Sequence, residues 1–445
     1  MQKALGQVSD DVAQGFEQFL QGFPSDWEAK MRELGAFTYA GKISSPQELL
    51  RAIFLYCGLD QSLREVAGTL TLQAERITDQ AVWKRLNRST PFLQAMLKSM
   101  LSLDDLPPLP NHLRFLAYDG TTLSCPGAKG ADYRLNLGID LGNLHFHEIY
   151  ISDIKMGESL KQFQLQPGDV AVVDRGYCSH SGIFNAVYDK GADVMVRWNH
   201  SRQLYDAQKP DQVIDFSRAL KDQKPGTSTT LPVLLKYAQR KNHPVKDNRK
   251  LSGYLHVYRM TAVEAQKAGS RVKRKKQKKQ KKVSETTLFL SQFVLVFTSL
   301  SVKQLSAETV LAIYRCRWQI ELSIKRMKSV IHLDKMRAKE GSQLAEAYLY
   351  GKVLYVLLVD QEMRANFGED WGGWAESRAG TPWRFYSLLK RRLDSRVLAP
   401  ESWKLEAAAS CFQVMMERPR KRKLQCLPRR IVDLSYLLDH LADAA

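Results

Sequence analysis

The sequence predicts an α/β protein in which a sheet-containing core lies between mainly helical regions. Residues 1 to about 105 contain few strand signals, whereas apolar runs of strand length follow one another between about residues 113 and 198. Helical patterns return after about residue 300 and dominate the rest of the chain. We therefore expect a helical domain at 1–108, a central α/β domain at 109–345 and a helical region at 346–445.

Composition and charge restrict the classes of partner. The chain has 445 residues, enough for two or three domains, with 66 Lys and Arg against 47 Asp and Glu, a formal charge of +19. Such an excess favours a polyanion, because each neutralised phosphate releases counterions. A membrane is not expected as a partner, since the best apolar stretch is interrupted by Lys352 and ends at Asp360. With no signal peptide and no paired cysteine motif, the sequence predicts a cytoplasmic protein with reduced thiols.

The N-terminal region is expected to bind DNA. Ser45 and Pro46 have the character of an N-cap and a first helical residue. Two helical segments, about 63–70 and 79–87, flank a short polar link, a pattern compatible with a helix-turn-helix. In that arrangement two side chains would face inward and three cations could reach DNA, namely Trp83 and Leu86, and Lys84, Arg85 and Arg88. A plain helical bundle with a basic outer face fits the same residues.

The strands of the central domain deliver two acidic residues. Five apolar runs occur in the order expected for a ribonuclease H-like core, the first three closely spaced and therefore antiparallel. We expect Asp119 at the end of the first strand and Asp174 at the end of the fourth. Asp140, Asp153, Asp169 and Glu148 also lie in or beside strands, and we interpret them as structural.

A basic insertion interrupts the central domain at about 199–287. It contains an alternating run, 253–260, and a block with nine Lys or Arg between Arg271 and Lys282. The block has one apolar residue, Val272, so we expect a mobile basic loop that contacts nucleic acid. After the insertion, residues 287–300 are expected to form a strand.

One long helix is then predicted at about 306–333, and it carries a stripe of polar side chains. Tyr314, Arg317, Glu321 and Lys328 follow one another at spacings of three, four and seven residues, which places them on one side of a helix. The inner apolar side would consist of Leu311, Trp318, Leu322 and Met327. Taken alone, such a stripe is typical of a solvated ion-pair face.

These motifs resemble the DDE transposases of bacterial insertion sequences, specifically the Tn5-like IS4 family. The family signature Y-(2)-R-(3)-E-(6)-K matches the polar stripe without a gap, and the first Asp is followed by Gly and Thr, the second by Arg, Gly and an aromatic residue. The resemblance implies that Asp119, Asp174 and Glu321 are catalytic metal ligands. It implies that the other three members of the stripe, Tyr314, Arg317 and Lys328, hold phosphates of the transposon end.

The resemblance also implies partners and a reaction. It implies cut-and-paste transposition by a homodimer that binds the double-stranded inverted-repeat ends of its element and target DNA, in the bacterial nucleoid. Three carboxylates are suitable ligands for Mg²⁺, with Mn²⁺ as a substitute, because hard cations prefer oxygen. The family stacks a displaced base on an aromatic ring of the insertion, for which Trp198, Tyr254 and Phe293 are candidates here.

Two other functions compete with this interpretation. The residues His256 to Arg259 form an H-x-x-R pattern, which tyrosine recombinases use without metal, but no matching Arg block precedes it. The second alternative is a non-catalytic DNA-binding protein derived from a transposase. Retention of all three carboxylates favours an active enzyme.

Overall fold

A computed structural model describes residues 15–101, 113–237, 249–367 and 382–416. The chain divides into two compact units. Of the described residues, the first unit holds 15–21, 28–92 and 393–416, and the second holds 22–27, 93–101, 113–237, 249–367 and 382–392. The proline-rich segment 107–110 and the cationic run 418–423 lie outside the described residues. None of the helices described here is both long and apolar enough to span a bilayer.

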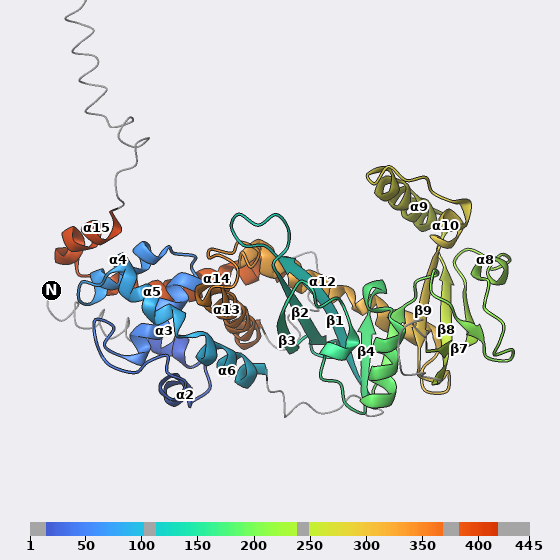
Figure 1. Ribbon diagram of the computed structural model, residues 1–445, viewed down its shortest axis with the longest axis horizontal. Coiled ribbons are helices and arrows are strands. Elements are labelled where there is room, and N and C mark those ends of the chain that lie inside the picture. The colour runs from blue at the N-terminus through green and yellow to red at the C-terminus, as the bar shows by residue number, and fades with distance from the viewer. Residues whose placement is uncertain (1–14, 102–112, 238–248, 368–381, 417–445) are drawn as a thin grey trace, which may run out of the picture. The chain divides into compact units, whose positions relative to one another are not determined.

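The first unit is helical (Figure 1). Its helices are α3 (Pro46–Cys57), α4 (Leu63–Gln73), α5 (Asp79–Asn87) and α15 (Ala408–Met415), and the unit boundaries fall within α2 (Trp27–Glu33), α6 (Thr90–Leu101) and α14 (Pro382–Leu398). The expected cap of α3 is confirmed, because the Ser45 side chain accepts a hydrogen bond from Glu48 N. Ser62 and Glu65 form a capping box that begins α4.

The predicted orientation of α5 is wrong for two side chains. Leu86 is buried as expected, but Trp83 is 41% exposed and Arg85 is buried. The Arg85 guanidinium lies over the ring of Tyr39 and donates to the Tyr39 carbonyl oxygen at 2.8 Å. Stacking and this hydrogen bond offset the cost of removing the cation from water. Only Lys84 and Arg88 of the three predicted cations are exposed.

The second unit is built on one nine-stranded mixed sheet (Figure 1). The strands are β1 (Arg114–Leu123), β2 (Tyr133–Asp140), β3 (Phe146–Asp153), β4 (Asp169–Val173), β5 (Asp193–Arg197), β6 (Tyr205–Asp206), β7 (Ser228–Lys236), β8 (Lys250–Arg259) and β9 (Phe293–Thr298). Their order is β3-β2-β1-β4-β5-β9-β8-β7-β6. The β1–β4 and β4–β5 pairs are parallel and the others antiparallel, which confirms the antiparallel pairing predicted for the first three strands.

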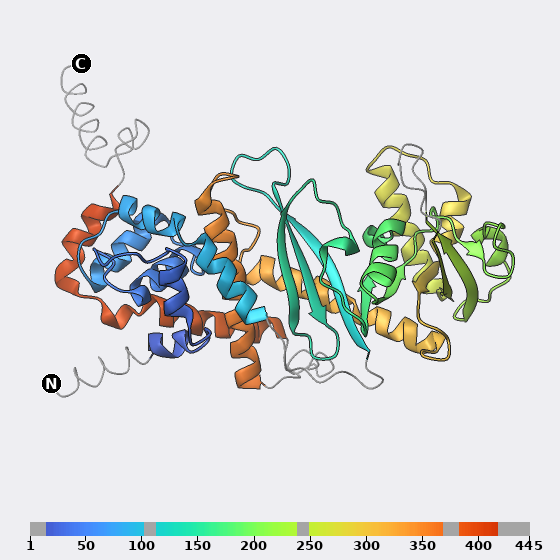
Figure 2. The same cartoon turned by 60° about the horizontal axis from the view of Figure 1, so that its bottom comes forward.

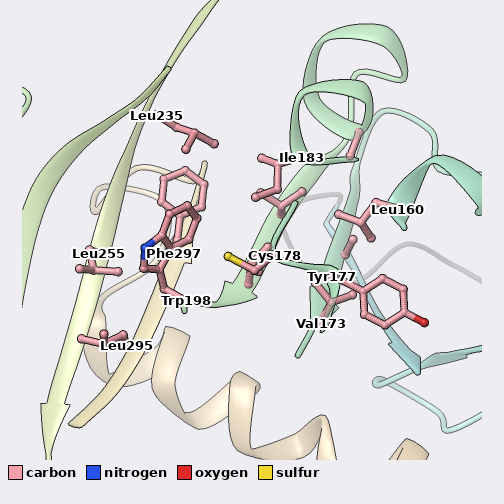
Figure 3. Packing of buried hydrophobic residues seen from close by; sticks show 14 of the residues in the cluster. Leu160, Val173, Tyr177, Cys178, Ile183, Trp198, Leu235, Leu255, Leu295 and Phe297 are labelled. Atoms are coloured by element: carbon pink, nitrogen blue, oxygen red, sulfur yellow. The ribbon is translucent and has the colours of Figure 1, made fainter. Parts of the chain in front are cut away.

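Both faces of the central strands are covered. Along β4, Ala171 and Val173 belong to one apolar cluster, whereas Val170 and Val172 belong to another. The first cluster is centred on rings such as Tyr177, Trp198 and Phe297, drawn in Figure 3. The second includes residues of the helix that follows the insertion. A parallel strand buried on both faces needs the continuous apolar run that β4 shows.

The insertion differs from expectation in two places. Its strands β7 and β8 continue the sheet beyond β9, and the alternating run falls in β8 as predicted. The basic block, however, is mostly helix α9 (Ala262–Gln277), which begins with a capping box of Thr261 and Glu264 and buries none of its residues. The strand predicted at 287–300 is shorter, because α10 (Glu285–Leu290) precedes β9. Figure 2 shows α9 and α10 beside the strands of the insertion.

The helix that carries the polar stripe is broken. It consists of α11 (Ala307–Cys316) and α12 (Trp318–Val330), which meet at Arg317. There, Arg317 N donates to the Tyr314 carbonyl and Ile320 N to that of Arg317, so the turn is tighter than in an α-helix. The break changes the phase, so the prediction that Trp318 faces inward is wrong: it is 48% exposed. Farther on, α13 (Gln343–Phe367) is a largely buried helix.

Candidate active site

The register of two parallel strands brings Asp119 and Asp174 side by side. In the β1–β4 pair, Tyr118 lies opposite Val173, and each acidic residue is the next one along its strand. Asp174 follows the end of β4, as predicted. Asp119 lies within β1 rather than at its end, because β1 continues beside β2, with Asp119 opposite Leu137. Ligand sites of α/β sheets commonly form at such carboxyl ends of parallel strands.

Glu321 reaches the same place from α12. This helix packs against β1 and β2, and Glu321 lies in its first turn. Burial raises the pKa of Asp119 to about 6, with further increases from Asp174 and Glu321, while the hydrogen bond from Gly120 N and the charge of Arg317 oppose the rise. The three carboxylates therefore share one partly buried electrostatic environment.

The cations of the stripe are already paired within this environment. Arg317 Nη2 lies 2.6 Å from Glu321 Oε1, and only 12% of the Arg317 side chain is exposed. Lys328 Nζ donates to the Thr122 carbonyl oxygen at 3.4 Å, near the end of β1. Tyr314 is buried rather than on an open face, but its ring lies under the Arg317 guanidinium at a centroid distance of 5.7 Å, so these two members of the predicted stripe are neighbours.

The three carboxylates are donors that suit a hard divalent cation, although their present arrangement is not that of a complete coordination site. Among the described residues, no three side chains of His, Cys, Asp or Glu have the geometry to hold a metal ion. Neighbouring carboxylates repel one another, and here Arg317 partly neutralises them. The oxygen donors and the unfavourable burial of negative charge at Asp119 both fit a cation such as Mg²⁺.

Several polar groups beside the carboxylates were not predicted from the sequence. Glu158, from the loop after β3, forms an ion pair with Arg134 of β2, and its carboxylate lies against Gly176. Tyr177 is fully buried, and its hydroxyl has no hydrogen-bond partner in the described part of the chain. Burial raises the pKa of Tyr177 far above its usual value, followed by the effects of Asp119, Glu158 and Asp174. No local motif marks Glu158, because its ion-pair partner Arg134 lies 24 residues away in sequence.

The other acidic residues of the strands have structural partners, in agreement with their interpretation as structural. Asp169 forms a 2.8 Å ion pair with Arg114. Asp140 accepts from Gly142 N, Asp153 from Lys155 N, and Glu148 from Gln164 N. The H-x-x-R pattern is also structural: His256 is buried in β8 and hydrogen-bonded to Thr230, and Arg259 donates to the Gln223 carbonyl.

A cavity of about 420 Å³ lies between α9, the end of β8 and the α11–α12 junction. Its wall includes the half-buried Tyr258 and the exposed ring of Trp318. The cations around it are Arg197, Lys267, Arg271, Arg315 and Arg317. Burial lowers the pKa of Arg197 to about 10. Trp198 and Phe293, two of the rings considered for base stacking, are fully buried, so only Tyr254 of those three is partly exposed.

Comparison with known proteins identifies relatives. The family described as "Transposase DDE domain" matches residues 110–357, more than half of the chain. The transposase for insertion sequence element IS421 of Escherichia coli is 30% identical over 344 residues, which cover 76% of this chain and 91% of that protein. The putative transposase InsL for IS186A of E. coli K12 is 29% identical over 343 residues, covering 76% and 90%. The transposase for IS231F of Bacillus thuringiensis is 23% identical over 252 residues, covering 54% and 52%.

Proposed function

Because this chain belongs to the DDE transposases of bacterial insertion sequences, enzymes that cleave DNA strands and transfer them, we propose that Asp119, Asp174 and Glu321 are its catalytic carboxylates. The observation that carries the proposal is the β1–β4 register, which sets Asp119 and Asp174 side by side. The influence of Glu321 on the pKa of Asp119 adds the third carboxylate.

The carboxylates supply oxygen ligands for divalent metal, which DDE transposases use. We propose Mg²⁺ in this protein, with Mn²⁺ as a substitute. When bound, such ions activate the attacking oxygen and stabilise the leaving oxygen of a phosphodiester. Asp119 and Asp174 are each fixed by one backbone donor, Gly120 N at 2.8 Å and Gly176 N at 2.7 Å, which orients the carboxylates before a ligand arrives.

Arg317 and Lys328 are proposed to hold phosphates of the transposon end, and the Tyr314 ring lies against the guanidinium of Arg317. Arg317 uses one amino group for Glu321 and has further N–H donors in a planar fork. Its guanidinium and that of Arg197 lie over the Tyr314 ring, with centroid distances of 5.7 and 5.9 Å. Tyr314 therefore supports both guanidinium groups from below, and a direct phosphate contact by its hydroxyl would require movement out of its buried position.

The cavity beside this junction is our proposed place for the displaced base. Its two accessible rings come from different elements, Tyr258 from the insertion and Trp318 from α12, and the surrounding cations suit the attached phosphate. Trp318 replaces the buried Trp198 and Phe293 as a candidate for stacking.

The partners follow from the same proposal. The protein binds the DNA of its element, as its family implies. We propose that it engages the inverted-repeat ends as a homodimer, joins them to target DNA in a cut-and-paste reaction, and works in the cytoplasm at the nucleoid. The formal charge of +19 supports an extended contact with DNA.

The test is cleavage of DNA that carries the inverted repeats flanking the reading frame. We expect cleavage in Mg²⁺, loss of cleavage in EDTA, and loss of cleavage but retained end binding in Asp119→Ala and Asp174→Ala. Asp211→Ala is the control, since Asp211 pairs with Lys236 in the insertion. Normal cleavage by Asp119→Ala would contradict the assignment. End binding without cleavage by the unaltered protein would support the non-catalytic alternative.

A further inference from the structure

A fourth carboxylate, Glu158, lies at the edge of the proposed active site. Its Oε1 atom accepts a hydrogen bond from Arg134 Nη1 at 2.7 Å. The pair is partly buried, with 15% of the Arg134 side chain and 31% of the Glu158 side chain exposed. The position of Glu158 is therefore set by a defined partner on β2, although the residue itself belongs to the loop after β3.

The other oxygen of Glu158 lies against the turn that carries Asp174. A methyl group built on Gly176 would overlap Glu158 Oε2 and would come 3.0 Å from Asp174 Oδ1. Asp174 Oδ1 also accepts the Gly176 N–H and thereby caps the short helix Arg175–Tyr177. The carboxylates of Glu158 and Asp174 thus both lie close to Gly176. The motif needs glycine here because Glu158 approaches the backbone closely.

Arg134 connects this turn to the strand that bears Asp119. Its Nη1 atom would lie 3.6 Å from a methyl group built on Gly120, the residue after Asp119. One guanidinium therefore lies near β1 and neutralises Glu158, whose charge would otherwise repel Asp174. Such a pair can fix the distance between β1 and the Asp174 turn.

We propose that Glu158, held by Arg134, is a positioning residue that orients Asp174 toward Asp119 and Glu321. The inference rests on the proposed function, because it takes the three carboxylates as metal ligands. Residues that hold metal ligands in place commonly change metal affinity by about 10-fold to 100-fold when they are replaced.

The test is iron-directed cleavage of the full-length polypeptide without DNA. Fe²⁺ with ascorbate and peroxide generates radicals that cut the backbone near the bound ion, so fragments ending near Asp119 and Asp174 report occupancy independently of transposition. We expect Glu158→Ala to raise the Fe²⁺ concentration for half-maximal fragmentation about 10-fold. Asp189→Ala is the matched control, since Asp189, like Glu158, forms an ion pair with an Arg side chain, here Arg249 at 2.8 Å.

Gly176→Ala reaches Glu158 from the other side. Its methyl group should displace the Glu158 carboxylate and would also come 3.0 Å from Asp174 Oδ1, so we expect a shift at least as large as that of Glu158→Ala. A Glu158→Ala titration that coincides with that of the control would overturn the inference. If circular dichroism shows that Glu158→Ala is unfolded, Glu158→Gln is tested instead. A half-maximal Fe²⁺ concentration for Glu158→Gln equal to that of the unaltered protein would then overturn the inference. Absence of fragments from the unaltered protein would instead contradict the proposed metal ligands.

Discussion

Two cationic helices of the second unit, α9 and α12, hold their charges in different ways. Helix α9 buries none of its residues and ends in Arg274, Lys275 and Lys276. Helix α12 buries Ile320, Ile324 and Met327. Two cations at its ends have defined acceptors: Arg317, just before the helix, is paired with Glu321, and Lys328, in its last turn, donates to the Thr122 carbonyl oxygen.

The difference teaches what each helix can contribute to DNA binding. Exposed charges are strongly hydrated and screened by salt, so each contributes little, and only their sum attracts a polyanion. A half-buried cation beside carboxylates interacts through a lower effective dielectric and in a fixed direction. We therefore expect α12 to determine where the DNA end lies and α9 to determine how strongly any DNA is attracted.

The largest expected effect is at Glu321, whose proposed role is to bind metal for the chemical step rather than to bind the DNA end. Glu321→Ala should reduce end cleavage by about 1,000-fold, because losing one metal ligand removes several kcal/mol of transition-state stabilisation. End binding should be equal or slightly tighter, since the variant removes a negative charge and releases Arg317. A gel-shift assay and a cleavage assay on the same DNA measure both quantities. If Glu321→Ala lost end binding as well as cleavage, Glu321 could not be assigned to the chemical step alone.

The next largest effect is on the affinity for the transposon end. Arg317→Ala and Lys328→Ala should each weaken end affinity about 10-fold or more, since a charge-assisted phosphate contact contributes about 1.5 to 3 kcal/mol. Raising the Mg²⁺ concentration should not restore binding. Lys303→Ala, at an exposed position before α11, is the control. If Glu321→Ala and both cation variants bind the end equally well, the stripe is an ordinary ion-pair face.

The position of Asp174 could be predicted from the sequence, whereas the exposure of Trp318 could not. Asp174 could be placed at the end of β4 because a five-residue buried strand leaves a clear apolar run. The exposure of Trp318 could not be predicted, since helical phase was extended through Arg317, where tight backbone hydrogen bonds break the helix. Arg85 was misplaced because its burial depends on Tyr39, a residue distant in sequence.

The basic block shows a different kind of error. Because the block has a single apolar residue, Val272, it was correctly expected not to pack into a core, and α9 has no buried residue. It did not follow that the segment lacks regular structure. Lys, Arg, Gln and Ala are good helix formers, and Thr261 with Glu264 supplies a capping box upstream. Helix formation and burial are separate properties, and the sequence pattern addressed only burial.

The smallest single-site effects on end affinity are expected on α9. These small effects should accumulate when several cations are replaced together, unlike the large single-site effects expected at α12. Replacing one cation, as in Lys275→Gln, should change end affinity less than about fivefold, the range of an exposed ion pair. Replacing all nine between Arg271 and Lys282 with Gln should flatten the dependence of binding on salt, by about 0.9 in the logarithmic slope for each phosphate that is no longer neutralised. The melting temperature should stay nearly constant, because α9 buries no residue. An unchanged slope would show that the charges of this basic block remain in solvent when DNA binds, which would favour the partly buried cations Arg317 and Lys328 as an electrostatic contact.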